Sequence, residues 1–147
     1  MYQHILIPTD GSALSSRAVS HGVAIAAAMK ARLTGLFVAP APTPLVFKGL
    51  VPVKHLQPDE HAALTAVAAR RYLGRIESTA ARAGVACECI TLTGEYPAQA
   101  ILEVAASRKC DLIVMGSRGL GTHTGALLGS VARSVVELSD VPVLLVK

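Results

Sequence analysis

The chain has 147 residues and a net charge of +4 at pH 7, and 52% of its residues are hydrophobic while only 16% are charged. A disordered chain would show the opposite balance, so we expect one folded domain, residues 1–147, with a sizeable core. Aromatic residues make up 3% and tryptophan is absent. This composition argues against stacking on single-stranded nucleic acid, and we expect no nucleic acid partner.

The N-terminal residues lack the basic stretch and the cleavage pattern of a secretory signal. The longest apolar run in an expected helix, residues 22–29, is too short to cross a membrane. Cys87, Cys89 and Cys110 form no zinc or redox spacing, so we interpret them as reduced packing side chains. We therefore expect a cytoplasmic protein with no membrane partner.

The first part of the chain alternates strand and helix. Residues 4–8 form a short apolar run, which is typical of a strand buried on both faces, and residues 9–12 carry turn and N-cap side chains. Apolar residues recur at helical spacing over residues 13–30, and residues 33–38 predict a second strand. Five prolines between residues 39 and 60 exclude a long helix there, so we expect a functional or mobile loop.

The second part continues the alternation. Residues 61–83 predict a long helix with an apolar stripe along one side. Three arginines lie on the opposite side, which we expect to face water: Arg71, Arg75 and Arg82. Residues 85–92 read as an edge strand, residues 97–109 as a helix behind a proline, and residues 111–115 as a buried strand. A glycine-rich loop, a helix over residues 130–139 with Ser130 as its N-cap, and a strand over residues 141–146 complete the chain.

Strands that alternate with helices predict a doubly wound α/β fold, here a five-stranded parallel sheet with helices on both faces. Ligands of such sheets bind beyond the carboxyl ends of the strands, at the point where the strand order reverses. With the first strand in the centre, that point lies between the first and fourth strands. Their carboxyl ends carry Pro8, Thr9, Asp10, Met115 and Gly116.

The loop from Gly116 to Gly129 contains five glycines and lies between a buried strand and a helix N-terminus. Backbone N–H groups at such a terminus favour a phosphate, and glycine allows the backbone to approach its oxygens. Ser130 can add a hydroxyl, and Arg118 can add a permanent positive charge. The loop has no lysine of a P-loop, and the dinucleotide pattern that begins at Gly119 reaches Thr124 where glycine is needed.

The spacing Gly116-x2-Gly119-x9-Gly129-Ser130 resembles the nucleotide loop of the universal stress protein family, whose ATP-binding members carry Gly-x2-Gly-x9-Gly-(Ser/Thr). Residues 5–12, 111–119, 128–131 and 141–146 are similar, in the same order, to the family's opening segment, its nucleotide loop and its closing strand. The resemblance covers nearly the whole chain.

This resemblance implies a strand order of 3-2-1-4-5 and a regulatory protein that switches with nucleotide occupancy in the stress response. It implies ATP, or else ADP or AMP, bound with Mg²⁺, and it implies Asp10 as the contact to ribose or to the nucleotide-bound metal. It also implies a homodimer that pairs through the closing strand, Val141 to Val146. The implied nucleotide contacts, with Met115 added from the strand ends, are Pro8, Thr9, Asp10, Val38, Met115, Gly116, Arg118, Gly119, Gly129, Ser130 and Val131.

The chain departs from the family within the nine-residue spacer, where members often carry basic residues. Here the spacer holds Thr122-His123-Thr124-Gly125, so His123 is the one candidate substitute for the missing charge. Two alternatives therefore remain: a dimeric scaffold of the same fold without nucleotide, and a slow ATP hydrolase. The sequence shows no spacing typical of a catalytic nucleophile or of metal ligands, so we expect no enzymatic activity other than slow ATP hydrolysis. We interpret His4 and His21 as packing residues.

Overall fold

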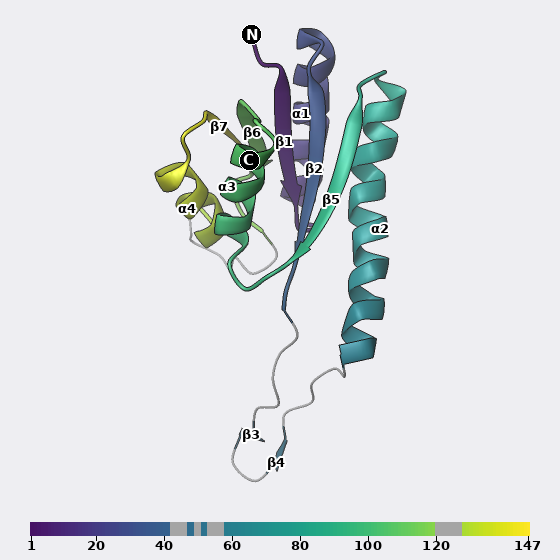
Figure 1. Cartoon of the computed structure of the whole chain (residues 1–147), viewed down its shortest axis with the longest axis vertical. Helices are drawn as coiled ribbons and strands as arrows, with labels where there is room; N and C mark the ends of the chain where they lie inside the picture. Colours follow the sequence, from purple (N-terminus) through teal and green to yellow (C-terminus); the bar gives the residue numbers. More distant parts are fainter. Residues whose placement is uncertain (42–46, 49–50, 53–57, 120–127) are drawn as a thin grey trace.

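A computed structural model describes residues 1–41, 47–48, 51–52, 58–119 and 128–147 (Figure 1). Its main sheet has five parallel strands in the order β5-β2-β1-β6-β7. Two very short strands, β3 (Phe47–Lys48) and β4 (Val51–Pro52), pair antiparallel outside this sheet. The predicted order 3-2-1-4-5 is therefore confirmed for the strands β1 (His4–Thr9), β2 (Arg32–Ala39), β5 (Cys87–Thr93), β6 (Leu112–Gly116) and β7 (Val143–Val146).

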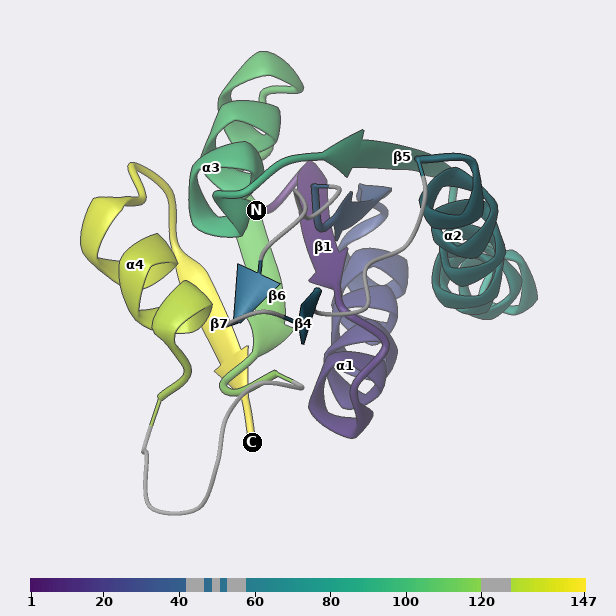
Figure 2. The same ribbon diagram turned by 90° about the horizontal axis from the view of Figure 1, so that it is seen from below.

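Four helices cover the two faces of the sheet, as the alternating pattern predicts (Figure 2). Helices α1 (Ala13–Met29) and α2 (Pro58–Arg82) pack on one face, whereas α3 (Pro97–Ser107) and α4 (Ser130–Leu138) pack on the other. Helix α2 begins three residues earlier than expected, at a proline whose missing N–H is no loss in a first turn. Much of the loop expected over residues 39–60 lies outside the described residues.

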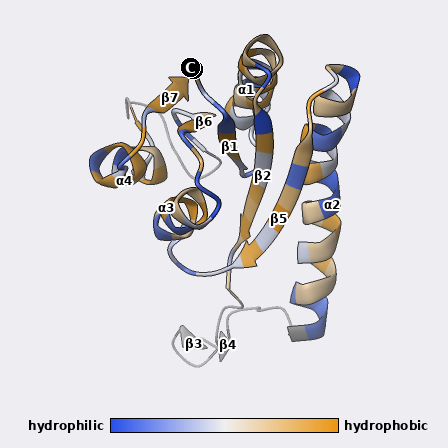
Figure 3. Cartoon of the chain, turned by 45° about the horizontal axis from the view of Figure 1, so that its top comes forward, coloured by the Kyte–Doolittle hydropathy of each residue, from blue (hydrophilic) through white to orange (hydrophobic). Residues whose placement is uncertain are grey.

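The core consists of two layers that share the central strands. Successive side chains of a strand point to opposite faces, so Ile5 and Ile7 pack under α1 and α2 while Leu6 packs under α3 and α4. All six residues of β1 are buried, which explains why its middle, Ile5 to Pro8, is apolar and why His4 and Thr9 at its ends are hydrogen-bonded. Figure 3 shows the middle of β1 and most of β2 in the hydrophobic colour, whereas α2 alternates between hydrophobic and hydrophilic bands.

Three helices end in the same way, with a residue of positive φ after the last turn. These residues are Lys30 (φ 55°), Gly84 (φ 69°) and Lys109 (φ 54°). In each case the next N–H group donates back to a carbonyl five residues earlier, for example Ala31 to Ala26 at 2.9 Å. This Schellman geometry satisfies helix carbonyls that would otherwise lack partners. Gly84 suits this position by residue type, whereas a positive φ is uncommon for lysine.

Asp111 joins the start of β1 to the start of β6. Its carboxylate accepts the backbone N–H groups of Gln3 (2.8 Å) and His4 (3.0 Å), and its own N–H donates to the His4 carbonyl (2.9 Å). The pairing of Ile5 with Leu112 follows directly. One side chain therefore sets the register between segments more than 100 residues apart in the sequence.

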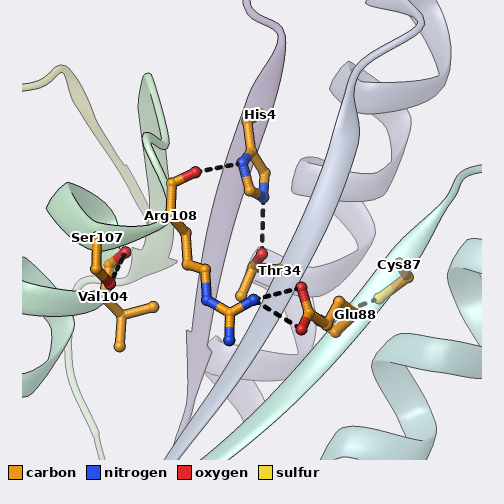
Figure 4. Close-up of polar contacts among 7 residues, drawn as sticks. All are labelled: His4, Thr34, Cys87, Glu88, Val104, Ser107 and Arg108. Carbon is orange, nitrogen blue, oxygen red and sulfur yellow. Dashed lines mark hydrogen bonds and ion pairs between the residues drawn. The ribbon is translucent and has the colours of Figure 1, made fainter.

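His4 is buried between β2 and the end of α3, with both ring nitrogens bonded (Figure 4). Nδ1 lies 2.9 Å from the Arg108 carbonyl, which can only accept, so Nδ1 carries a proton. In the neutral ring Nε2 then accepts from the Thr34 hydroxyl at 2.7 Å. His4 is thus a packing residue as expected. His21 is exposed, so the same expectation is wrong for it.

An ion pair lies beside this histidine on the surface. The Arg108 guanidinium, just after α3, contacts both carboxylate oxygens of Glu88 on β5, at 2.7 and 2.8 Å (Figure 4). Both side chains are about half exposed, so the pair contributes at most about 1 kcal/mol to stability. It nevertheless joins the edge strand β5 to a helix on the α3/α4 face.

We predict that the His4→Gln variant loses less folding stability than wild type when the pH is lowered from 7.5 to 5.5. Burial, and then the charge of Arg32, lowers the pKa of His4 below its usual value of 6.5. The unfolded chain therefore binds a proton at a higher pH than the folded chain, so stability falls as the pH drops below 6.5 toward the folded pKa. Urea unfolding at pH 7.5 and pH 5.5 measures this loss for wild type and variant.

The matched control is His21→Gln, which removes an exposed histidine and should keep the wild-type pH dependence. An equal loss of stability in His4→Gln and wild type would contradict the assignment of this effect to His4.

Candidate functional site

A cavity of about 550 Å³ lies at the carboxyl ends of β1 and β6, where the sequence predicts a ligand. This size falls in the range of small-molecule sites. The structure brings together around it all eleven residues that we assigned to a nucleotide from the sequence: Pro8, Thr9, Asp10, Val38, Met115, Gly116, Arg118, Gly119, Gly129, Ser130 and Val131.

One wall of the cavity is apolar. Leu36 and Val38 come from β2, Met115 from β6, and Pro97 and Ile101 from α3. Leu36, Pro97 and Ile101 were not predicted from the sequence. The spacing of these residues could have indicated two of them. Leu36 is two positions from Val38 on the same strand and so points to the same face, and Ile101 lies one helical turn after Pro97. Three further lining residues were also missed: Ser15, Leu128 and Ala132.

The turn after β1 is held by its own side chains. The buried Thr9 hydroxyl bonds the Ser15 hydroxyl at 3.1 Å and accepts the Gly11 N–H at 3.2 Å. The Ser12 side chain caps α1 by accepting the Ser15 N–H, and one Asp10 oxygen accepts the Ser12 N–H at 2.9 Å. The carboxylate of Asp10 is therefore held at the rim of the cavity by the N-cap of the first helix.

Gly119 faces Asp10 across the cavity mouth. A Cβ atom at this glycine would collide with Oδ2 of Asp10, so no larger residue fits there without moving the carboxylate. Gly116 is also confined, because its Cβ would lie 3.1 Å from backbone and side-chain atoms of Leu14. These two glycines let the chain after β6 lie directly against the start of α1.

The two ends of the glycine-rich loop are tied to each other and to the sheet. The Gly129 N–H donates to the Ser117 carbonyl at 2.8 Å, and the Ser117 N–H donates to the Val146 carbonyl at 2.9 Å. Ser117 itself is buried. The spacer Thr122 to Gly125, with His123, lies outside the described residues.

Helix α4 begins at Ser130, and Gly129 is its N-cap, so the expectation that Ser130 caps the helix is wrong by one residue. Gly129 has an extended conformation and no side chain to bond the first N–H groups. These donors and the Ser130 hydroxyl lie at the edge of the cavity, where the positive end of the helix dipole favours an anion. The shift therefore leaves helix donors available that a capping side chain would have used.

The polar groups of the cavity suit a ligand with one anionic end. Asp10 and Arg118 are the charged residues among the described lining, which also includes the first residues of α4. Within the described part of the chain, no three His, Cys, Asp or Glu side chains form a cluster that could hold a metal ion. The same part of the chain contains no helix with the length and apolarity that a membrane span requires.

The three cysteines lie away from this cavity and are free thiols. Cys87 and Cys89 lie on β5 with their sulfurs 4.0 Å apart, and the hydrogen bond between them lowers the pKa of Cys87 and raises that of Cys89. Burial raises the pKa of Cys110 to about 11. The expectation of unpaired packing thiols therefore agrees with the structure.

The family is decided by comparison with known sequences. A profile described as the universal stress protein family matches residues 1–147. The chain belongs to the universal stress protein family. YxiE of Bacillus subtilis is 34% identical over 149 residues, with both proteins covered completely. A universal stress protein of Thermus aquaticus, from the 3′ region of the QAH/OAS sulfhydrylase, is 39% identical over 153 residues, again with both covered completely.

Solved structures of universal stress proteins share this fold. One of them, in complex with cAMP, is 32% identical with a TM-score of 0.68, and the match covers 99% of this chain and 96% of that chain. A family member from Burkholderia pseudomallei is 26% identical with a TM-score of 0.75, over the same shares of the two chains.

We predict that Thr9→Val destabilises this universal stress protein by about 1 kcal/mol, while Thr9→Ser has a smaller effect. Valine has a similar shape but leaves the Gly11 N–H without its side-chain acceptor, whereas serine keeps the hydroxyl. Urea unfolding at neutral pH measures the difference. Equal stability of the two variants would show that the hydroxyl of Thr9 does not hold the turn.

Proposed function

We propose that this universal stress protein binds an adenine nucleotide in the cavity at the ends of β1 and β6. The observation that carries the proposal is that apolar side chains, the Asp10 carboxylate and the N-terminus of α4, which no side chain caps, line one cavity. The cAMP complex of a relative that is 32% identical supports the same class of ligand.

The apolar wall suits the base. A purine is flat and largely apolar on its faces, and Leu36, Val38, Ile101 and Met115 offer side chains without charge. Leu36 is fully buried and Ile101 nearly so, so these walls are fixed by the core rather than by the ligand. Backbone groups of Thr9 and Val38, at the ends of β1 and β2, are close enough to the cavity to bond the edge of the base.

The opposite end suits the sugar and phosphate. The Asp10 carboxylate is an acceptor for ribose hydroxyls, and it is also the group that would meet a Mg²⁺ ion carried by the nucleotide. Gly129, Ser130 and Val131 lie where backbone N–H groups of a helix N-terminus can donate to a phosphate. The Arg118 guanidinium adds a charge that matches phosphate geometry.

Among adenine nucleotides we propose ATP, because the spacing of Gly116, Gly119, Gly129 and Ser130 resembles that of the ATP-binding members. The proposed role is binding rather than fast hydrolysis. Fast phosphoryl transfer needs a group that positions the attacking water. Among the described lining residues Asp10 is the one carboxylate, we assign it to the ribose or to Mg²⁺, and no histidine is present. Phosphate release that persists in Asp10→Ala with Arg118→Ala would come from a contaminating enzyme.

We further propose that occupancy regulates the protein as a homodimer. Strand β7 lies at one edge of the sheet, and Val143 to Val146 present backbone groups that a second copy can pair. Size-exclusion chromatography with light scattering measures the mass with and without ATP, and hydrogen exchange follows residues 39–60. If neither responds to ATP, the switching role fails while nucleotide binding still stands.

The first test identifies the native ligand. Protein purified without added nucleotide is denatured, and released small molecules are identified by chromatography and mass spectrometry. We expect adenine nucleotide near one per chain. An empty protein that also fails to bind Mg-ATP at millimolar concentration would favour the scaffold without nucleotide.

We predict that Gly119→Val lowers adenine nucleotide affinity by about tenfold or more, because its side chain collides with Asp10 and displaces the carboxylate. Isothermal titration with AMP and ATP measures the loss. Gly94→Val is the matched control, since a Cβ at Gly94 meets no atom within 4 Å and this glycine does not line the cavity. Unchanged affinity in a folded Gly119→Val protein would place the phosphate or ribose elsewhere.

A further inference from the structure

A second hollow lies on the other face of the sheet, between α1 and α2, and shares no lining residue with the nucleotide cavity. This basic groove has a volume of about 650 Å³. Five arginines line it, one from α1 and four from α2, and the described lining contains no acidic residue. They are Arg17, Arg70, Arg71, Arg75 and Arg82.

The positive charge of the basic groove is not balanced within the described part of the chain. Its five arginines exceed the net charge of +4 of the whole protein, so the rest of the chain carries a slight negative charge. The described ion pair, between Arg108 and Glu88, involves none of them. Arg71 and Arg75 are four residues apart on one helix, where like charges destabilise each other. An anion in the groove would relieve this repulsion.

Hydroxyl groups and open space complete the groove. Ser16 and Ser20 come from α1, and Ser78 and Thr79 come from α2. The Ser16 hydroxyl accepts a hydrogen bond from Arg75, which holds that guanidinium between the two helices. Gly74 opens the middle of the groove, because a Cβ built on it would meet no atom within 4 Å.

The lining selects a ligand made of phosphate alone. Among the described residues that line it, there is no aromatic ring on which a base could stack and no carboxylate that could bind an amine. Guanidinium groups match phosphate oxygens in pairs and remain charged at every physiological pH. The arginines of α2 span residues 70 to 82, which is about 18 Å along a helix, so they match an elongated anion.

We propose that the basic groove between α1 and α2 binds a linear inorganic polyphosphate chain. The arginines contact successive phosphate groups along α2, with Arg17 closing the groove from α1. The site is independent of the nucleotide cavity, and it holds whether or not an adenine nucleotide binds there.

The test is equilibrium binding of a fluorescently labelled polyphosphate of defined length to the full chain. We expect binding that weakens as NaCl is raised, since surface charges are screened by salt. Gly74→Glu adds a negative charge in the middle of the groove and should weaken binding about tenfold or more. Gly74→Gln adds the same volume without the charge and is the matched control, with an expected loss within about threefold. Both replacements favour the helix over glycine, so the fold is retained.

Two further variants locate the binding. Arg133→Gln removes an exposed arginine on α4, outside the groove, and should leave polyphosphate affinity unchanged. Gly119→Val alters the nucleotide cavity and should also leave it unchanged. Polyphosphate should raise the melting temperature of wild type more than NaCl at equal ionic strength does, and this gain should be lost in Gly74→Glu.

Three outcomes would overturn the proposal. Equal affinity of Gly74→Glu, Gly74→Gln and wild type would place the anion elsewhere. A loss in Gly119→Val alone would assign the anion to the nucleotide cavity. A short DNA duplex or polyglutamate could also displace the labelled polyphosphate. If either does so at a lower concentration than unlabelled polyphosphate, counted as moles of negative charge, the groove serves a macromolecule of another class.

Discussion

The pairing of β1 with β6 is the constraint on which the rest of this structure depends. It joins the beginning of the chain to a strand more than 100 residues later, and it places both strands in the middle of the sheet. The Asp111 carboxylate accepts two N–H groups at the start of β1, so a slip by one residue would lose both bonds. Such a slip would also turn Ile5 and Ile7 to the opposite face of the sheet.

This pairing also determines what can happen at the other end of the two strands. Because they are parallel, they end at the same edge, and the chain leaves each of them toward a different face: to α1 after β1, and through the glycine-rich loop to α4 after β6. Asp10 follows β1 and Gly119 follows β6, so the two residues lie next to each other at the edge of the sheet where the two connections diverge. The cavity is thus a product of topology, and the side chains decide only what it holds.

The alternating pattern alone predicted a five-stranded parallel sheet with a ligand at the ends of its first and fourth strands, whereas the strand order and the lining residues other than Met115 came from the resemblance to universal stress proteins. The buried strands contain continuous apolar runs, and the ends of two such strands were each followed by turn residues or glycine. Helix caps depend on finer geometry. Ser130 looked like an N-cap from its residue type, but the bond from the Gly129 N–H to Ser117 places the cap one residue earlier.

Features that depend on neighbouring helices could not be predicted from one segment at a time. The arginine face of α2 was correctly placed in water, yet only the packing of α1 beside α2 brings Arg17 and the serines of α1 to the same groove. Ile101 reaches the cavity because α3 packs on the face of the sheet that α4 shares. Nothing local to these residues distinguishes a groove or a wall from an ordinary helix surface.

The lysines at the ends of α1 and α3 have a consequence for how the protein responds to its solvent. Lys30 and Lys109 adopt a positive φ that costs an L-residue about 1 kcal/mol relative to glycine. Their charges lie at helix C-termini, where a cation stabilises the helix by about 0.3–1 kcal/mol at low ionic strength. The two effects nearly offset each other in dilute buffer, but salt screens only the second. Both helix ends therefore lose a part of their stability as ionic strength rises, while the cost of the positive φ stays the same.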